Sequence, residues 1–330
     1  MITTLFFDDV YLYGVSTVTG IKEKEGPLGK LFDYSFNTKL GGEATFELFE
    51  AKMIKMALEI VLNKTHLNIK DIEIAIGGDL TNQIVSSNIA FKNLETSFIG
   101  VYGACSTSML SLLIGASFVS MNLTKNALSF ASSNFYAAER QFRYPVEYGV
   151  NKKETATITT TGASCALVSN KKSKIKIVSA TIGKVIDLDW TDTNDMGSVM
   201  AYAAHDTIIN HLKNTKTTLD DYSLILTGDL SNLGSKVLRD LFMLNNNPIK
   251  NHMDAGCMIY DRENQKDVFC GGSGRACLPL VGYTLILNEL LNNKYERVLF
   301  VGTGCLHSKG SSAQKQSIPV IAHAVEIRRI

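Results

Sequence analysis

Residues 103–109 hold the part of this sequence best suited to covalent chemistry. They read GACSTSM, with Cys105 between small residues that would leave its sulfur accessible. The apolar run 98–102 predicts a buried strand before this segment, and residues 108–121 are apolar on almost every face, as in a helix buried in a large core. Cys105 is therefore expected at a strand-to-helix turn, where the positive end of the helix favours a thiolate nucleophile. A buried structural cysteine is the alternative.

A nucleophilic cysteine that attacks a carbonyl group needs further groups around it. A general base, usually histidine, must take a proton, and a second His or Asn must hold the carbonyl oxygen. His323, near the C-terminal strand, is the histidine we expect to reach the site, and a structural role is its alternative. His307, which follows a glycine-containing turn, carries less weight.

Two arginines could instead bind an anion. Arg140 and Arg143 lie three residues apart in ERQFRYP, beside aromatic residues, and guanidinium groups bind carboxylates through paired hydrogen bonds. The alternative is a solvated surface loop with Glu139 and Glu147 as ion-pair partners. Residues 195–200 (DMGSVM) predict an adaptable lid over the site or, alternatively, an ordinary helix start capped by Ser198.

Composition excludes several classes of protein. The 330 residues include 33 basic and 32 acidic ones, a formal net charge of +1, so no basic field indicates nucleic-acid binding. No uncharged apolar run reaches the ~18 residues of a membrane span, and the N-terminus lacks the pattern of a signal peptide. The six cysteines form no CxxC pair, which predicts reduced cytosolic thiols rather than disulfides or a zinc site. No metal or cofactor is expected.

Apolar runs and helical spacing alternate along the chain. Residues 45–62 have helical spacing, a helix ending near Ala90 follows the first of the strands, and the predicted strands are 72–76, 98–102, 127–131, 163–168 and 175–182. Residues 1–44 are expected to be rich in loops, and 135–162 to form a long polar connection. This alternation predicts an α/β protein with parallel strands.

The second half of the chain repeats the first. The segment GDLTN at 78–82 reappears as GDLSN at 228–232, and both follow an apolar strand and open a helix. Two more segments match in the same order, the cysteine turn with 271–278 and the strand 128–131 with 298–301. We therefore predict two α/β halves, 1–173 and 174–330. Because ligands bind beyond the carboxyl ends of such strands, the halves are expected to share one site centred on Cys105.

A duplicated α/β chain with a cysteine turn before a buried helix resembles the thiolase fold of thiolases and ketoacyl synthases, which implies a layered αβαβα arrangement. The chain resembles still more closely the stage V sporulation protein AD family of spore-forming Firmicutes, over essentially its whole length. The segments that carry this resemblance are 22–29 (KEKEGPLG), 103–109, 138–145 (AERQFRYP), 195–198 (DMGS) and 317–323 (SIPVIAH).

The family resemblance implies a function in sporulation. Members bind dipicolinic acid (pyridine-2,6-dicarboxylate) and take part in its uptake into the developing spore, within a multi-subunit apparatus at the inner forespore membrane. It implies a protein on the cytoplasmic side, peripheral to that membrane, with the ligand either free or chelated to calcium. A homodimer is expected from the fold alone. The alternatives are a Cys105-dependent condensing or acyl-transfer enzyme and an assembly subunit that acts only through protein contacts.

The residues themselves argue against condensation chemistry. The second-half turns that supply His and Asn in condensing enzymes read GDLSNLG at 228–234 and GGSG at 271–274. These missing side chains are expected to leave room for a small anion, so a non-catalytic binding protein is the preferred interpretation. The expected ligand-binding residues are Cys105, Arg140, Arg143, Asp79, Asn82, Asp229, Gly272, Ser273 and His323.

Overall fold

The two halves of the protein build their sheets in the same strand order, as seen in a computed structural model that describes residues 3–330. The first-half order is β5-β4-β6-β8-β2 and the second-half order is β11-β10-β13-β14-β9. The two sheets meet at a single register pair, Tyr11 with Lys176. The first-half strands are β2 (Tyr11–Thr19), β4 (Ile74–Gly78), β5 (Ser97–Gly100), β6 (Asn126–Ser133) and β8 (Gly162–Ser169). Those of the second half are β9 (Ile175–Ile182), β10 (Leu224–Thr227), β11 (His252–Asp254), β13 (Arg297–Cys305) and β14 (Val320–Arg329).

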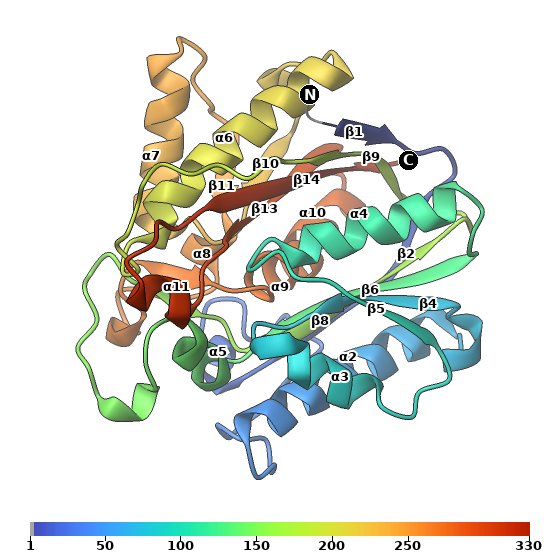
Figure 1. Cartoon of the computed structure of the whole chain (residues 1–330). Helices are drawn as coiled ribbons and strands as arrows, with labels where there is room; N and C mark the ends of the chain where they lie inside the picture. The colour runs from blue at the N-terminus through green and yellow to red at the C-terminus, as the bar shows by residue number, and fades with distance from the viewer. Residues whose placement is uncertain (1–2) are drawn as a thin grey trace.

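Helices cover both outer faces of the sheets and fill the space between them (Figure 1). The outer helices are α2 (Phe46–Thr65) and α3 (Val85–Phe91) on the first sheet, and α6 (Met196–Thr215) and α7 (Ser231–Leu244) on the second. The inner layer holds α4 (Thr107–Ser120) and a continuous run of α9 (Cys277–Val281), a π-helical turn (Gly282–Ile286) and α10 (Leu287–Leu291). This arrangement confirms the layered αβαβα fold.

Each sheet is mixed rather than parallel. β4 pairs in parallel with β5 and β6, whereas β6, β8 and β2 pair antiparallel. The second half repeats this arrangement, with β10 parallel to β11 and β13, and with β14 antiparallel to its two neighbours. The expectation of parallel strands is therefore correct for three strands of each half and wrong for two, because an antiparallel neighbour needs no helical crossover.

Two segments expected to be irregular contain regular structure. The nine-residue strand β2 lies within 1–44, and its sequence YLYGVSTVT hides it because polar residues are buried on both faces. Within 135–162, α5 (Phe135–Phe142) starts at Asn134, whose side chain accepts hydrogen bonds from the N–H groups of Tyr136 and Ala137. The short elements are β1 (Thr3–Phe6), α1 (Ile21–Lys24), β3 (Tyr34–Ser35), β7 (Thr157–Thr159), α8 (Ala255–Met258), β12 (Gly271–Ser273) and α11 (Lys309–Ala313).

Helix α4 is buried, as its sequence predicts. Met109, Leu112, Leu113, Ala116 and Val119 are at most 2% exposed and pack in one cluster with residues of both sheets and of α9. Burying each of the larger side chains contributes about 1.5–3 kcal/mol, so α4 fixes the position of the turn that precedes it.

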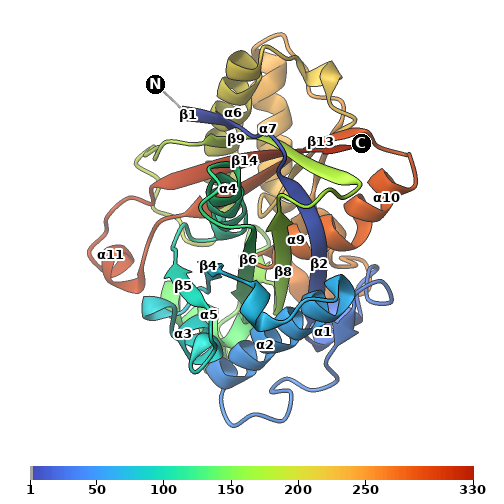
Figure 2. The ribbon, with the colours of Figure 1, turned by 90° about the vertical axis from the view of Figure 1, so that its right-hand side faces the viewer.

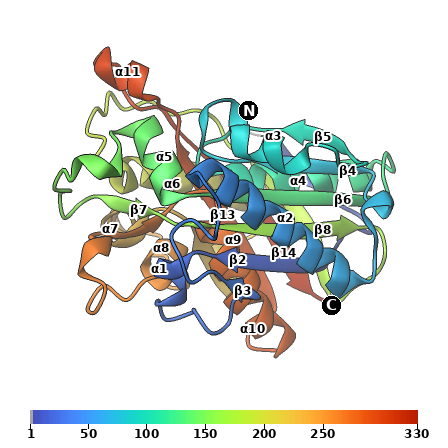
Figure 3. The same cartoon turned by 90° about the horizontal axis from the view of Figure 1, so that it is seen from below.

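Figure 3 shows α5, β7 and α11 gathered at one end of the molecule, away from the C-terminus. The candidate site lies at this end. All six cysteines are free, and no group of His, Cys, Asp or Glu side chains within residues 3–330 is arranged to hold a metal ion. Within the same range, every helix is too short or too polar to cross a membrane.

Candidate functional site

The cysteine turn is held by its own side chains. Ser106 Oγ donates to the Gly103 carbonyl at 2.6 Å, and Thr107 Oγ1 donates to the Ala104 carbonyl at 2.8 Å. Ala104 has φ +49°, a conformation that non-glycine residues rarely adopt. A Cβ on Gly304 of β13 would lie 2.5 Å from the Gly103 carbonyl oxygen, so the second-half sheet approaches the turn closely. Tertiary packing thus holds Cys105 in a strained turn before α4.

Cys105 opens into a small pocket built by both halves. Its walls include Phe142, Met196, Ser273, Cys305 and His307, which come from α5, α6, β12 and the end of β13. Its volume is about 20 Å³, close to the roughly 10–15 Å³ that one water centre needs. A pyridine dicarboxylate is many times larger, so it can enter only if side chains in the wall move.

A short polar chain links Cys105 to the second half. Cys105 Sγ lies 3.7 Å from Ser273 Oγ, and Ser273 Oγ donates to Asp229 Oδ1 at 3.2 Å. The other oxygen of Asp229 is buried without a hydrogen-bond partner in the described part of the chain. Burial, followed by the charge of Asp254, raises the pKa of Asp229 well above its usual range. Ser273 therefore links the sulfur to a buried carboxyl group of the second half.

The expectation of a thiolate at Cys105 is wrong. Burial, with the negative charge of Asp229 second, raises the pKa of this thiol to about 12. The hydrogen bond with Ser273 and the charge of Arg275 act in the opposite direction but are weaker. Desolvation penalises the charged form, and it outweighs the helix-terminus effect expected from the sequence.

In the turn 271–274, which was expected to lack the asparagine of condensing enzymes, the space beside Gly272 is occupied. A Cβ built there would lie 2.6 Å from Ile259 Cγ2 and 3.2 Å from the ring of Tyr260. The prediction that the missing side chain leaves room is therefore wrong at this position, because Ile259 and Tyr260 occupy the space.

Asp79 and Asn82 lie away from the pocket walls. The Asp79 carboxylate accepts the N–H groups of Thr81 and Ser87, and it also accepts both of their hydroxyl groups. Asn82 is exposed in the turn that follows. The geometry gives Asp79 a structural role in the first-half turn, and a contact of either residue with ligand remains a prediction.

The two arginines differ sharply. Arg140 is partly exposed and forms an ion pair with Glu47 on α2. Arg143 is buried: its Nη1 lies 2.9 Å from Glu139 Oε2, and its Nε donates to the Thr193 carbonyl at 3.0 Å. Arg143 Nη2 has no hydrogen-bond partner within residues 3–330. Arg143 follows Phe142 of the pocket wall but is not itself among the residues that line the pocket, and its contact with a ligand stays a prediction.

The two candidate histidines also differ in their position relative to the pocket. His323 is buried in β14, where its Nδ1 accepts the N–H of Gly183 at 3.3 Å, and it is not among the residues that line the pocket. His307 does line the pocket. Burial, with the charge of Arg143 second, lowers the pKa of His307 to about 4. The sequence could have indicated that His307 lines the pocket, because it follows strand β13 by two residues and ligands bind beyond the carboxyl ends of such strands.

The segment expected as a lid starts a helix. Asp195 caps α6 by accepting the N–H of Ser198 at 3.1 Å, so the alternative of an ordinary helix start holds, with Asp195 rather than Ser198 as the cap. Met196 in the first turn still contributes to the pocket wall.

Arg275, which lies in the second half of the chain, contacts the first half next to Cys105. Its side chain is fully buried, its Nε donates to the Ala104 carbonyl at 2.9 Å, and its guanidinium lies 4.3 Å from the centre of the Tyr102 ring. This second-half side chain therefore holds the strained residue that precedes Cys105.

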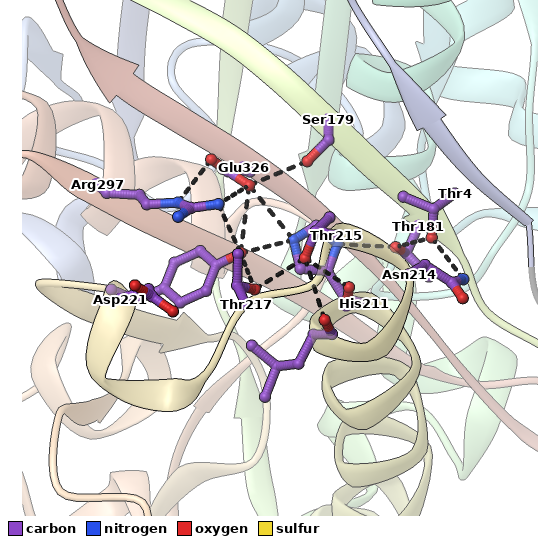
Figure 4. Close-up of polar contacts among 12 residues, drawn as sticks. Thr4, Ser179, Thr181, His211, Asn214, Thr215, Thr217, Asp221, Arg297 and Glu326 are labelled. Carbon is purple, nitrogen blue, oxygen red and sulfur yellow. Dashed lines mark hydrogen bonds and ion pairs between the residues drawn. The ribbon is translucent and has the colours of Figure 1, made fainter.

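A second buried polar cluster surrounds Glu326 (Figure 4). Glu326 binds Arg297 through two contacts of 2.7 and 2.9 Å, and it accepts the hydroxyl groups of Ser179 and Tyr222. Arg297 begins β13 and Cys305 ends it, so about 26 Å of strand separates this cluster from the pocket. Through Glu326, the cluster connects the neighbouring strands β13, β14 and β9 by side-chain hydrogen bonds.

Comparisons with known proteins agree with this fold. The family model for stage V sporulation protein AD matches residues 2–328. Stage V sporulation protein AD of Bacillus subtilis (strain 168) is 42% identical over 328 residues, covering 99% of this chain and 96% of the relative. Similar solved structures include a point variant of OleA from Xanthomonas campestris, with 13% identity, a TM-score of 0.64 and 98% of each chain covered. Another is 3-oxoacyl-[acyl-carrier-protein] synthase III from Aquifex aeolicus VF5, with 15% identity, a TM-score of 0.58 and coverage of 97% and 99%. At these identities the solved structures show a shared fold alone.

Proposed function

The chain belongs to the stage V sporulation protein AD family, and we propose that it binds dipicolinate during uptake into the developing spore without catalysing a reaction. Membership of a sporulation family and a fold shared with condensing enzymes support a small-molecule site at the junction of the halves. The ligand is a flat ring with two carboxylates, so its site must offer both a slot and a cation.

The observation that carries this proposal is the state of Arg143. A buried guanidinium nitrogen without a protein partner is costly, and an anion would satisfy it. Arg143 follows Phe142 of the pocket wall, and its charge reaches His307 in the same wall. We assign to Arg143 the contact with one carboxylate of dipicolinate.

The surroundings of Cys105 support binding rather than turnover. With its pKa raised to about 12, the thiol favours its protonated form at pH 7. The side-chain hydrogen-bond partner of its sulfur is Ser273 rather than an imidazole. Cys105 would then contribute a small, neutral surface to the pocket.

Ligand entry requires the pocket to open. Phe142, Met196 and His307 sit on three separate segments, so rotation of these side chains can widen the space without changing either sheet. We propose that the bound ligand passes to membrane subunits of the uptake apparatus at the inner forespore membrane, with this chain peripheral on the cytoplasmic side and paired as a homodimer.

Calorimetry with dipicolinate, with and without calcium, tests the function. Arg143→Gln should weaken binding about ten- to hundredfold, the loss expected for one charged hydrogen-bonded contact of about 1.5–3 kcal/mol. Arg140→Gln is the matched control and should bind like the parent, because Arg140 pairs with Glu47 outside the pocket. Cys105→Trp should fold and fail to bind. Normal binding by folded Cys105→Trp would place the ligand elsewhere, and normal binding by Arg143→Gln would remove the assigned contact.

A further inference from the structure

The turn between α4 and β6 exposes two large apolar side chains. Met121 and Leu123 are 66% and 62% exposed, although they directly follow the buried helix α4. Asn122 between them has φ +56°, and the N–H groups of Asn122 and Leu123 donate to the carbonyls of Val119 and Phe118. The turn is therefore a hydrogen-bonded helix end of a common kind, and it leaves both apolar side chains in contact with water.

Hydrogen bonds join this turn to the connection between β8 and β9. Asn170 donates its N–H to the Lys125 carbonyl at 3.3 Å. Ser169 Oγ donates to Asn126 Oδ1 at 2.8 Å. Two segments that are far apart in the chain therefore lie side by side at the surface.

The surface formed by residues 121–126 and 170–176 is basic, and we call it the lysine face. These segments contain no acidic residue and five lysines, Lys125, Lys171, Lys172, Lys174 and Lys176. The first four are exposed, and all five are absent from the ion pairs formed within residues 3–330. Lys171 instead lies 5.0 Å from the centre of the Tyr13 ring. The lysine face thus surrounds an apolar pair with positive charges.

The carboxylates beside the lysine face do not cancel this charge. Glu73 holds the turn, because its Oε2 accepts the N–H of Asn126 at 3.1 Å and the hydroxyl group of Thr124. Asp8 and Asp9 are exposed in the bend that leads into β2, which pairs with β9 at one position. These three charges are fewer than the five lysines, so an excess of positive charge remains.

The lysine face lies at the end of the molecule opposite the Cys105 pocket. The Lys174 carbonyl accepts the N–H of Ile330 at 3.0 Å, and Figure 2 views the end that carries the C-terminus and the last turn of α4. Cys105 precedes α4 and Met121 follows it, and the 14 residues of this helix span about 21 Å. Docking through the lysine face would therefore leave the pocket open to water.

We propose that the lysine face binds the surface of an anionic lipid bilayer. Met121 and Leu123 enter the boundary between headgroups and acyl chains, where burial of apolar area is favourable. The lysine ammonium groups lie at the level of the lipid phosphates, because their long side chains reach back to the charged layer. The inference deepens the peripheral location proposed above, on which its choice of partner rests, by naming the surface that makes the contact.

An acidic partner protein is the competing occupant. A bilayer fits better because Met121 and Leu123 stand largely exposed on a turn, and lipid needs no complementary shape. Exposed apolar residues also occur singly without a function. Met243 and Leu244 at the end of α7 are exposed as well, but three asparagines follow them instead of lysines, so they provide a control within the same chain.

The test uses the full chain and vesicles of phosphatidylcholine with roughly 30% phosphatidylglycerol, with pure phosphatidylcholine vesicles as the matched control. Sedimentation should show saturable binding to the anionic vesicles that weakens with salt, and about tenfold weaker binding to the control. Lys171→Glu and Leu123→Asp should each weaken binding about fivefold or more. Lys184→Glu, which changes an exposed lysine paired with Asp206, and Leu244→Asp should bind like the parent.

Insertion of the turn has a separate readout. The fluorescence emission of Leu123→Trp should move to shorter wavelengths when anionic vesicles are added, whereas that of Leu244→Trp should not. No binding of the parent to anionic vesicles, equal binding by Lys171→Glu, or an unchanged emission of Leu123→Trp would overturn the proposal. Self-association of the chain that is lost in Leu123→Asp would assign the lysine face to a second copy and also overturn it.

Calorimetry with dipicolinate separates the lysine face from the pocket. Lys171→Glu and Leu123→Asp should bind dipicolinate like the parent, because α4 separates both residues from Cys105. Vesicle binding that fails while dipicolinate still binds overturns the lipid contact alone. Dipicolinate binding that fails while vesicles still bind overturns the proposed ligand and leaves the lipid contact supported.

Discussion

The turns after β4 and β10 share the sequence GDL(T/S)N and the same place in their sheets, yet their aspartates have opposite surroundings. Asp79 has both carboxylate oxygens occupied, with the N–H groups of Thr81 and Ser87 at 2.8 and 2.7 Å. Asp229 receives Ser273 Oγ at 3.2 Å, and its second oxygen has no hydrogen-bond partner in the described residues.

Asp254 explains the difference. In the second half this residue takes over the bonds that hold the turn, because it accepts the N–H groups of Ser231, Leu230 and Gly256 at 2.8, 3.2 and 2.9 Å. It also accepts the Thr227 hydroxyl at 2.6 Å. The aspartate of the first-half motif therefore holds its own turn, whereas that of the second half does not and instead accepts the hydroxyl of Ser273, a residue of the Cys105 pocket.

The largest expected effect is on stability, and it should differ between substitutions of Asp79 and of Asp229. Asp79→Ala should lower the free energy of unfolding by roughly 3–5 kcal/mol, because it leaves two buried N–H groups and two hydroxyl groups without an acceptor. Asp229→Ala should cost far less, since it removes a buried carboxyl group that is poorly hydrogen-bonded. Urea unfolding of both variants measures the difference, and equal losses would contradict the division of roles.

The two halves should also differ in how their stability depends on acid pH. The Glu326 cluster lies in the second half, and β8, the counterpart of β14 in the first half, carries no carboxylate. Burial alone would raise the pKa of Glu326, but His211, whose Nε2 lies 3.6 Å from Glu326 Oε2, and the hydrogen bonds from Arg297 outweigh burial and lower the pKa to about 2. Ionised Glu326 therefore stabilises the folded protein fully above the pKa that this carboxyl has in the unfolded chain. As the pH falls from about 4.5 towards 2, the free energy of unfolding should decrease by about 3 kcal/mol. Unfolding of the parent and of Glu326→Gln across this range should converge at the acid end, and a constant difference would refute the assignment.

Gly272 in β12 and Gly115 in α4 differ in how much space surrounds them. A Cβ at Gly272 meets Ile259 Cγ2 at 2.6 Å, whereas one at Gly115 of α4 meets its nearest neighbour at 3.6 Å, an ordinary contact. Gly272→Ala should cost about 1–3 kcal/mol by overpacking. Gly115→Ala should be neutral or stabilising, because alanine favours the helix. Thermal unfolding of both variants tests this, and a tolerated Gly272→Asn would show that the space can be recovered.

The smallest effect concerns the reactivity of Cys105. Asp229→Asn should lower the pKa of the thiol and increase its alkylation by iodoacetamide at pH 9 severalfold, because the charge of Asp229 raises that pKa. Asp79→Asn should leave the rate unchanged, provided that the variant folds. Mass spectrometry of the Cys105 peptide reports the rate, with Cys105→Ala as the control, and equal rates in the parent and Asp229→Asn would remove the proposed coupling.

Local pattern was enough to predict much of the fold. The apolar segment at α4, the turn before it and the repeated GDL motif follow from neighbouring residues, and they predicted a duplicated α/β protein. The layered arrangement was implied by the resemblance to the thiolase fold. Strand β2 was missed because the pattern of period two depends on one polar face, and this strand is buried on both. The boundary at residues 173 and 174 stays a prediction.

The sequence by itself determined which residues follow strand ends and could meet at a shared site. Only the tertiary structure decided that Arg143 is buried while Arg140 faces outward, that His307 lines the pocket while His323 does not, and that the Cys105 thiol resists ionisation. The physical reason is that burial and unpaired polar atoms depend on contacts between residues far apart in the chain. Two aspartates with the same local sequence can therefore have opposite surroundings.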